Sequence, residues 1–253
     1  MNKRDYIYAK TCFKLQIRQH ISMFFTLVFP IIMTIIFVSG FGSTIPGFNF
    51  INKYFFIAVS LSVIAMSTLS IPLSFSFDLK LNILKQLKCL DVQVIRFKVI
   101  DTVISIAIMY VEVIILLIFS KVVYNLEIDS ILNVFKYLLL LLPGVLSIAF
   151  LGTMIALLVK QPESYMPVGI TLMMILLALS GCLGFDPTQI DSPIFKVYEY
   201  LPSYYMANSL YDVWFGENFD YLGYLLSCCI FAAIGLVIYV VNILKVKGVK
   251  WKK

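Results

Sequence analysis

The stretch NILKQLKCLDVQVIRFKVI, residues Asn82 to Ile100, is basic and amphipathic, and a strongly apolar run lies on each side of it. Its cationic side chains are Lys85, Lys88, Arg96 and Lys98. Its apolar side chains recur at helical spacing, at Ile83, Leu84, Leu87, Leu90 and Val94. We therefore predict a helix from Asn82 to Val94 that either lies on anionic lipid or docks its apolar ridge in a groove of a partner.

The composition around this stretch identifies the class of protein. Of the 253 residues, 61% are hydrophobic and only 13% are charged, whereas soluble domains are about a quarter charged. A soluble core of this length could not bury so much apolar surface. The chain is therefore predicted to be an integral membrane protein.

Six segments are long and apolar enough to span a bilayer, which takes roughly 20 residues of helix. They are about Ser22–Phe41, Tyr54–Phe77, Ile100–Ser120, Phe135–Val159, Tyr165–Leu183 and Tyr221–Leu244. We predict an all-α fold of six transmembrane helices, forming a single transmembrane domain over residues 1–253.

The distribution of positive charge predicts how these helices are oriented. Sixteen of the 20 Lys and Arg residues fall in the N-terminal segment, the second and fourth loops and the C-terminal tail. Cytoplasmic segments carry such an excess. Both termini and the loop of residues 78–99 are therefore predicted to be cytoplasmic. The membrane itself is expected to be a bacterial cell membrane.

Residues 1–21 precede the first predicted span and suggest a helix at the membrane surface. At 100° per residue, the five basic side chains of this segment fall within an arc of roughly 120°. This pattern predicts an interfacial elbow helix with Lys10, Lys14 and Arg18 toward anionic lipid. The alternative is a frayed basic tail.

The predicted external segment, residues 184–220, is acidic and rich in aromatic side chains. It is too small for a separate folded domain, so we predict a short re-entrant or interfacial helix after Pro202, with Tyr205, Leu210 and Trp214 toward the bilayer. Aromatic side chains at the water boundary usually act as anchors. Alternatively, Tyr204 and Tyr205 form an external gate.

Glu112 lies near the middle of the third predicted span, VISIAIMYVEVIILLIFS. A carboxyl group is costly at that depth, and no Lys or Arg lies deep in any of the six segments. Glu112 either faces a wet cavity or the seam of a dimer, where it contacts a cationic substrate, or is a protonated side chain bonded to a neighbouring helix.

The sequence offers little for covalent chemistry. It has one histidine, five scattered cysteines without metal-ligand spacing, and no G-x-x-x-x-G-K-[ST] loop for nucleotide phosphates. We predict no catalytic residues, no cofactor-binding residues and no metal ligands, and nothing predicts a nucleic-acid partner.

Together, the interfacial helix, six spans, basic second loop and aromatic last loop resemble an ABC-2-type permease, the membrane subunit of an ATP-driven exporter. In the second loop Leu84, Lys85, Leu87 and Val92 match the family pattern, and Lys98 opens the third span. Asn82–Ile83 replaces the family's Gly–Thr, and Asp91 replaces its proline. These departures leave the subfamily open.

The resemblance implies two permease copies, a homodimer being favoured, with a separate cytoplasmic ABC ATPase under each. ATP and Mg would bind to that ATPase and not to this chain. The residues implied to couple the two subunits are Leu84, Lys85, Leu87, Lys88, Leu90, Asp91 and Glu163. Size, layout and an Ile/Lys/Asn-rich composition are similar to exporters of phenol-soluble modulins and to bacteriocin self-protection permeases. An amphipathic or hydrophobic substrate, favoured to be a peptide or toxin, is therefore expected to move outward.

Two other classes of function compete with this reading. An ion-coupled carrier would use Glu112 as its proton site and would depend on a proton gradient instead of ATP. A membrane protease would need paired acids, a Ser/His dyad or metal ligands within the spans, and the single acidic residue at that depth argues against one.

Overall fold

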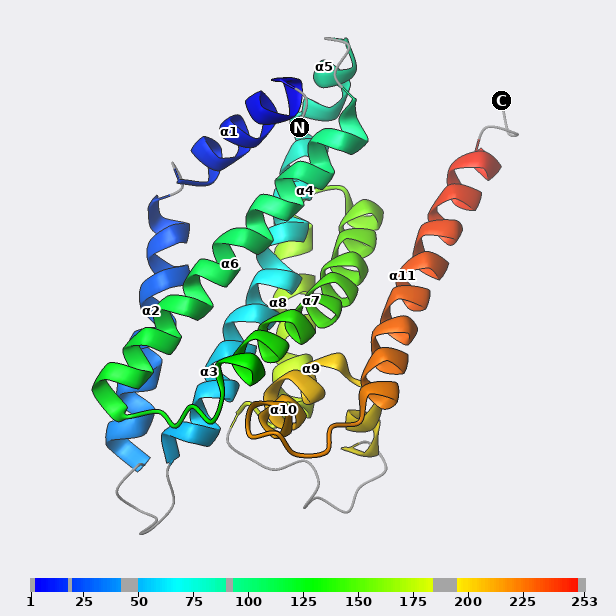
Figure 1. Ribbon diagram of the computed structural model, residues 1–253. Coiled ribbons are helices and arrows are strands. Elements are labelled where there is room, and N and C mark those ends of the chain that lie inside the picture. Colours follow the sequence, from blue (N-terminus) through cyan, green and yellow to red (C-terminus); the bar gives the residue numbers. More distant parts are fainter. Residues whose placement is uncertain (1–2, 18–19, 42–49, 90–92, 184–194, 250–253) are drawn as a thin grey trace. The chain divides into compact units, whose positions relative to one another are not determined.

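The structure, a computed structural model, describes residues 3–17, 20–41, 50–89, 93–183 and 195–249 (Figure 1). Every regular element within these ranges is helical, which confirms the all-α prediction. The elements are α1 (Lys3–Ile17), α2 (His20–Phe41), α3 (Phe50–Ala65), η1 (Met66–Ser70), α4 (Ile71–Lys80), α5 (Ile83–Cys89), α6 (Val94–Tyr124), α7 (Ile131–Val159), α8 (Pro162–Leu179), η3 (Phe195–Tyr200), α9 (Pro202–Tyr204), η4 (Tyr205–Ser209), α10 (Leu210–Trp214) and α11 (Tyr221–Val249).

Five helices in the described part of the chain are long and apolar enough to cross a membrane. They cover Ile51–Lys80, Arg96–Tyr124, Ile131–Val159, Pro162–Leu179 and Tyr221–Val240, and they coincide with the second to sixth predicted spans. The first predicted span lies in α2, where the described apolar stretch, Pro30–Gly40, is shorter. A sixth span therefore stays a prediction.

The chain divides into two compact units, and the single transmembrane domain stays a prediction. Unit 1 comprises Met1–Ser62 and Asn82–Glu127, and unit 2 comprises Val63–Leu81 and Ile128–Lys253. The long helix that begins as α3 and continues through η1 into α4 contributes residues to both units.

In unit 1, helix α6 has one buried stripe and one exposed face. Buried side chains recur every three or four residues, at Ile106, Met109, Val113 and Leu116, as expected for a helix that packs along one side. On the other side, Val103, Val111 and Ile118 are exposed. An apolar exposed face of this kind suits contact with lipid.

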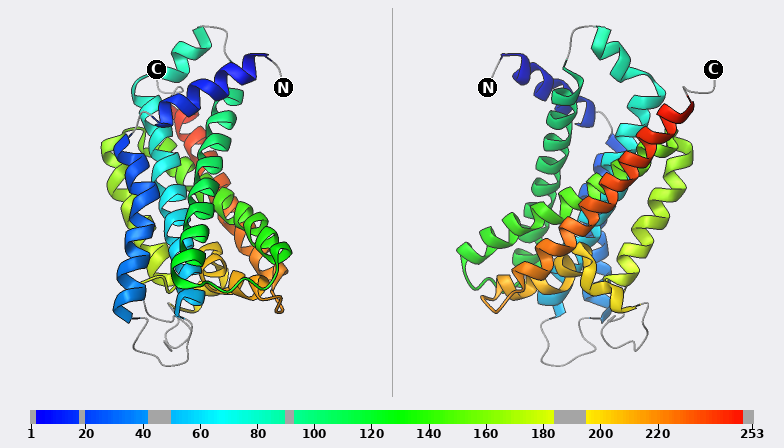
Figure 2. Two further views of the ribbon diagram at one scale, coloured as in Figure 1. Left: turned by 60° about the vertical axis from the view of Figure 1, so that its left-hand side comes forward. Right: turned by 90° about the vertical axis from the view of Figure 1, so that its right-hand side faces the viewer.

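Helix α1 packs across one end of α6, as both views of Figure 2 show. At the other end of α6, the chain after Tyr124 is tied to the start of α3. The Asn52 amide donates to the Glu127 carboxylate at 2.9 Å, and the Glu127 N–H donates to Asn52 Oδ1 at 3.1 Å. This reciprocal pair closes unit 1 at the end opposite α1.

In unit 2, α11 runs along α7 (Figure 1). The Tyr224 hydroxyl of α11 lies between two backbone groups of α7: it accepts a hydrogen bond from Gly144 N–H at 3.0 Å and donates one to the Leu140 carbonyl at 2.6 Å. These two groups would bond to each other in a regular helix. The side chain is therefore inserted into the helical ladder beside Pro143.

A second tyrosine stabilises the interruption between α3 and α4. Pro72 has no N–H to offer the Thr68 carbonyl, its partner in a regular helix. The buried Tyr165 hydroxyl of α8 donates to that carbonyl at 2.6 Å. The turn at η1 is wider than an α-helical one, with Ile71 N–H bonded to Met66 O. The interrupted span thus keeps its buried backbone satisfied.

The prediction that Leu210 and Trp214 face the bilayer is wrong. Short helical turns do follow Pro202, but both side chains are fully buried in unit 2. The Trp214 ring packs edge-on against Tyr137 of α7, with 5.5 Å between the ring centroids. The two side chains bury their large apolar area against protein because α10 packs on α7.

Candidate functional site

The quoted stretch forms α5, which is shorter than predicted. It begins after Asn82, whose backbone is left-handed with φ 54°, and it ends at Cys89. Gln93 then adopts an extended conformation before α6 begins at Val94. Among the described residues, α5 covers seven positions of the helix predicted over Asn82–Val94.

Four of the predicted coupling residues lie on α5, namely Leu84, Lys85, Leu87 and Lys88. The Leu87 side chain is half-buried. Leu90 and Asp91 lie outside the described residues. In Figures 1 and 2, α5 and α1 lie at the same end of unit 1, so the two elements predicted to be cytoplasmic share one end of that unit.

Glu163, the remaining predicted coupling residue, forms an ion pair with Lys80 in unit 2. Lys80 is the last residue of α4, and Glu163 lies in the first turn of α8, where the helix dipole favours a carboxylate. The side chains are 46% and 62% exposed, respectively. Such an exposed pair contributes little to stability because water screens its charges, and both groups are open to a partner. The sequence analysis had not connected Lys80 with Glu163.

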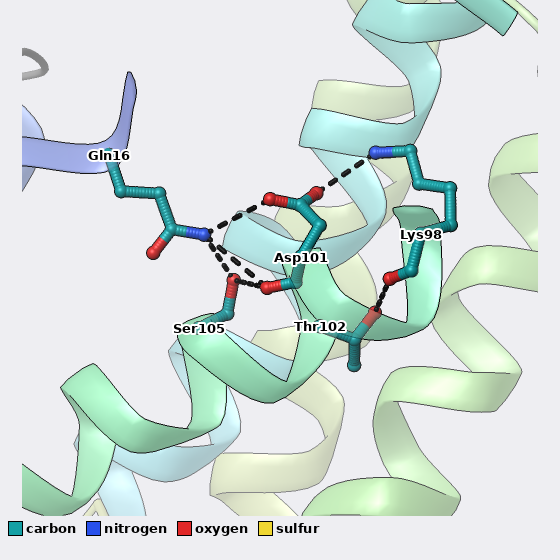
Figure 3. A network of polar contacts seen from close by, with 5 residues as sticks. All are labelled: Gln16, Lys98, Asp101, Thr102 and Ser105. Carbon is teal, nitrogen blue, oxygen red and sulfur yellow. Dashed lines mark hydrogen bonds and ion pairs between the residues drawn. The ribbon is translucent and has the colours of Figure 1, made fainter. Parts of the chain in front are cut away.

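A network of hydrogen bonds joins α1 to α6 (Figure 3). The Gln16 amide donates to Ser105 Oγ at 2.7 Å and to Asp101 Oδ1 at 3.3 Å. Asp101 Oδ2 accepts from Lys98 Nζ at 2.9 Å, and the side chains of this pair are only 15% and 18% exposed. Sequence reasoning missed Gln16 and Asp101. The signals available in the sequence were the Asp101 carboxylate at the start of the third predicted span and the Gln16 amide on the non-basic side of the predicted N-terminal helix.

The remaining faces of α1 are open to the surroundings. Lys10 and Lys14, predicted to meet the membrane surface, are exposed. Tyr6 and Phe13 are also exposed, whereas Cys12 is buried. Arg18 lies outside the described residues. One face of α1 therefore contacts protein, and the others combine cations with aromatic side chains.

Glu112 is buried in unit 1, with only 2% of its surface exposed. Neither carboxyl oxygen has a hydrogen-bond partner among the described residues. The Ser62 hydroxyl of α3 lies beside the carboxyl group but outside hydrogen-bond geometry. The interior of the unit thus holds a carboxyl and a hydroxyl group that are adjacent and unbonded.

Tyr204 and Tyr205 belong to a chain of aromatic rings in unit 2. Tyr204 contacts Tyr198 at 4.5 Å between centroids, and Tyr205 contacts Tyr224 at 5.7 Å and Phe219 at 6.4 Å. Both predicted gate residues are half-buried. The rings therefore form one continuous cluster that connects the loop to the first turn of α11.

Carboxylates make the surroundings of this cluster electronegative. Burial, followed by the negative charges of Asp220 and Glu199, raises the pKa of Tyr205. Burial and the neighbouring Glu217 likewise raise the pKa of Asp212. Gly223 allows the Tyr205 hydroxyl and the Asp220 carboxylate to lie close to the backbone of α11, since a β-carbon at position 223 would meet both groups.

Hydrogen bonds fix the loop segment to the end of α8. Ser180 and Ser203 are joined through their hydroxyl groups at 2.6 Å, and the Asn208 amide donates to the Ser180 carbonyl at 2.8 Å. The Tyr204–Tyr205 segment is therefore anchored on one side by a buried hydroxyl contact and on the other by a half-buried amide contact.

Comparisons with known proteins identify a family. The model of the ABC-2 family transporter proteins matches residues 44–243. A comparison with curated proteins found no match, and neither did a comparison with solved structures. The family match includes α5, the Lys80–Glu163 pair, Glu112 and the aromatic cluster.

Proposed function

Because this chain belongs to the ABC-2 family of transporter proteins, we propose that it is the permease of an ABC exporter that moves an amphipathic or hydrophobic substrate outward, a peptide or toxin being favoured. Family membership makes the chain a multi-pass membrane subunit and implies an ABC ATPase as its partner. The sequence has no phosphate-binding loop of its own, so ATP and Mg would be bound by that ATPase.

The observation that carries the proposal is α5. It is a short helix with two lysines, and the chain on each side of it leads into a long apolar helix. A protein that binds α5 would therefore act directly on two spans. Leu84, Leu87 and Leu90 would supply apolar anchors, and Lys85 and Lys88 would pair with acidic residues around the groove. Asp91, which follows α5 in the sequence, and Glu163 of unit 2 are also proposed to bind the ATPase.

The assembly would contain two permease copies, with a homodimer favoured, and one ATPase under each. The excess of Lys and Arg supports cytoplasmic termini, and the membrane is proposed to be a bacterial cell membrane. The exposed Lys10 and Lys14, together with Arg18, would place the N-terminal helix on anionic lipid. Tyr204 and Tyr205 would form a gate on the external side of the path.

Two variants of α5 test the proposal. Leu87→Asp should abolish recruitment of the ATPase, because loss of one buried anchor costs over about 2 kcal/mol, more than tenfold in affinity. Lys85→Ala should weaken binding less, and its effect should shrink at high salt because exposed charges are screened. The measurement is retention of the ATPase by purified permease, together with ATP hydrolysis by the complex.

If α5 instead lies on lipid, the order reverses: Lys85→Ala changes membrane contact, and Leu87→Asp retains full ATPase binding. That result would refute the proposed coupling.

An ion-coupled carrier with Glu112 as its proton site is the second candidate. It is supported by the burial of that carboxyl group, and it predicts transport that stops when the proton gradient collapses and that ignores ATP.

A further inference from the structure

We propose that Glu112 and Ser62 form an internal binding site for one ammonium or guanidinium group, so that the substrate is a cationic amphipath. The inference rests on the proposed function and extends it by assigning a charge to the substrate. It concerns only residues of unit 1 and does not involve the ATPase contact.

The position of Glu112 on α6 provides the first argument. It lies within the buried stripe of the helix, next to Met109, Val113 and Leu116, which are all buried and apolar. The carboxyl group is thus directed into the interior of the unit, away from the exposed face marked by Val111 and Ile118.

The second argument is energetic. A buried polar group without a hydrogen bond destabilises the fold, and a carboxyl at bilayer depth is costly to insert. A glutamate kept for structural reasons would be expected to have a protein donor. Neither of its oxygens has one among the described residues, and the adjacent Ser62 hydroxyl is also unbonded. The pair therefore retains its full capacity for a ligand.

The third argument is the placement of the cations on α6. Lys98 is paired with Asp101 at one end of the helix, and Lys121 Nζ donates to the Leu126 carbonyl at the other. Lys121 is nine residues from Glu112, about 14 Å along a helix. Arg96, the third cation of α6, is sixteen residues from Glu112. No cation of α6 is therefore close enough to neutralise Glu112, and a bound cation would supply the missing positive charge.

The chemistry of the pair selects the class of ligand. A carboxylate and a hydroxyl oxygen accept hydrogen bonds from an ammonium or guanidinium group, and such charge-assisted bonds are the strong ones. The apolar side chains on either side of Glu112 suit the hydrocarbon part of an amphipath. Two oxygen-bearing side chains are too few for Ca²⁺ or Mg²⁺, which require about six or more oxygen ligands.

The test uses purified permease in phosphatidylcholine vesicles, without the ATPase. Dicyclohexylcarbodiimide, an apolar reagent for carboxyl groups within membranes, is added, and loss of the unmodified Glu112 peptide is measured by mass spectrometry. Both products then count as modification: the N-acylurea, and the amide that forms, with release of dicyclohexylurea, when a primary amine attacks the activated carboxyl. We expect dodecylammonium to slow modification at least tenfold in a saturable manner. Dodecanol, which has the same chain without the charge, should have no effect.

Dodecyltrimethylammonium is the control for membrane surface charge, because it is cationic but has no N–H donor. It should protect Glu112 at least fivefold less than dodecylammonium. Ser62→Ala should raise the half-protecting concentration of dodecylammonium several-fold. Ser120→Ala, another buried serine of unit 1 without a hydrogen-bonded hydroxyl, should leave that concentration unchanged.

Three results would overturn the proposal: no modification of Glu112, no protection by dodecylammonium, or equal protection by both cations. A folding defect does not confuse the outcome, because protection is measured on the wild-type chain. Binding of radiolabelled dodecylammonium to Glu112→Gln should fall to the level of lipid alone, with an unchanged melting temperature as the check on folding. Loss of ATPase binding in Leu87→Asp is a separate result, so the two proposals can fail independently.

Discussion

At the scale of single residues, two buried tyrosines stabilise two proline-containing helices in different ways. The Tyr165 hydroxyl bonds the Thr68 carbonyl, which has no helical donor because Pro72 lacks an N–H. The Tyr224 hydroxyl lies between Gly144 N–H and the Leu140 carbonyl, which could bond each other directly. Loss of the Tyr165 hydroxyl should therefore lower the free energy of unfolding more than loss of the Tyr224 hydroxyl.

We predict that Tyr165→Phe lowers the free energy of unfolding by about 1–3 kcal/mol, because a buried carbonyl is left without a donor. Tyr224→Phe should cost less, since the helix can close its own bond. The measurement is thermal or detergent-induced unfolding of the purified protein. Tyr200→Phe, at a 57% exposed tyrosine, is the matched control. A larger loss in Tyr224→Phe than in Tyr165→Phe would contradict this account.

At the scale of elements, the described side chains that join α1 to α6 share one face of α1. Gln16 joins it to Asp101 and Ser105 of α6, and Tyr8 contacts Phe97 edge-on at 5.9 Å between centroids. The same face contains Cys12, which is 1% exposed. Release of α1 from α6 would therefore expose the Cys12 thiol, whose rate of modification can be measured.

We predict that Gln16→Ala increases the rate of maleimide modification at Cys12 several-fold, because the amide bonds α1 to Asp101 and Ser105 of α6. Thr11→Ala is the control, since Thr11 is exposed and its hydroxyl bonds only the Ile7 carbonyl of the same helix. Modification is followed at Cys12 by mass spectrometry, because Cys89 and Cys229 are exposed and also react. Equal rates in the wild type and Gln16→Ala would show that apolar packing alone holds α1.

At the scale of the whole molecule, the distribution of Lys and Arg predicts the orientation in the membrane. Sixteen of the 20 cations belong to segments predicted to be cytoplasmic. The exposed Cys89 of α5 provides a natural reporter for this side. Asp191, between the fifth and sixth predicted spans, is the corresponding position for the external side.

We predict that a membrane-impermeant maleimide leaves Cys89 unmodified in intact cells and modifies it after the membrane is permeabilised. Asp191→Cys should react in intact cells. The reagent reports orientation because it cannot cross the bilayer. Modification of Cys89 from outside would reverse the orientation and would remove α5 from reach of a cytoplasmic ATPase.

Local properties of the sequence determined the helical class, five of the apolar spans, the basic helix α5 and the isolated carboxyl of Glu112. Hydropathy, helical spacing and charge are carried by neighbouring residues, so they can be read without a fold. The tertiary structure alone decided two hydrogen bonds between distant residues. Gln16 and Asp101 are 85 positions apart, and Tyr165 and Thr68 are 97 positions apart. It also buried Leu210 and Trp214, which the sequence analysis had placed toward lipid. An apolar side chain has the same periodicity whether lipid or protein covers it, and only packing distinguishes the two.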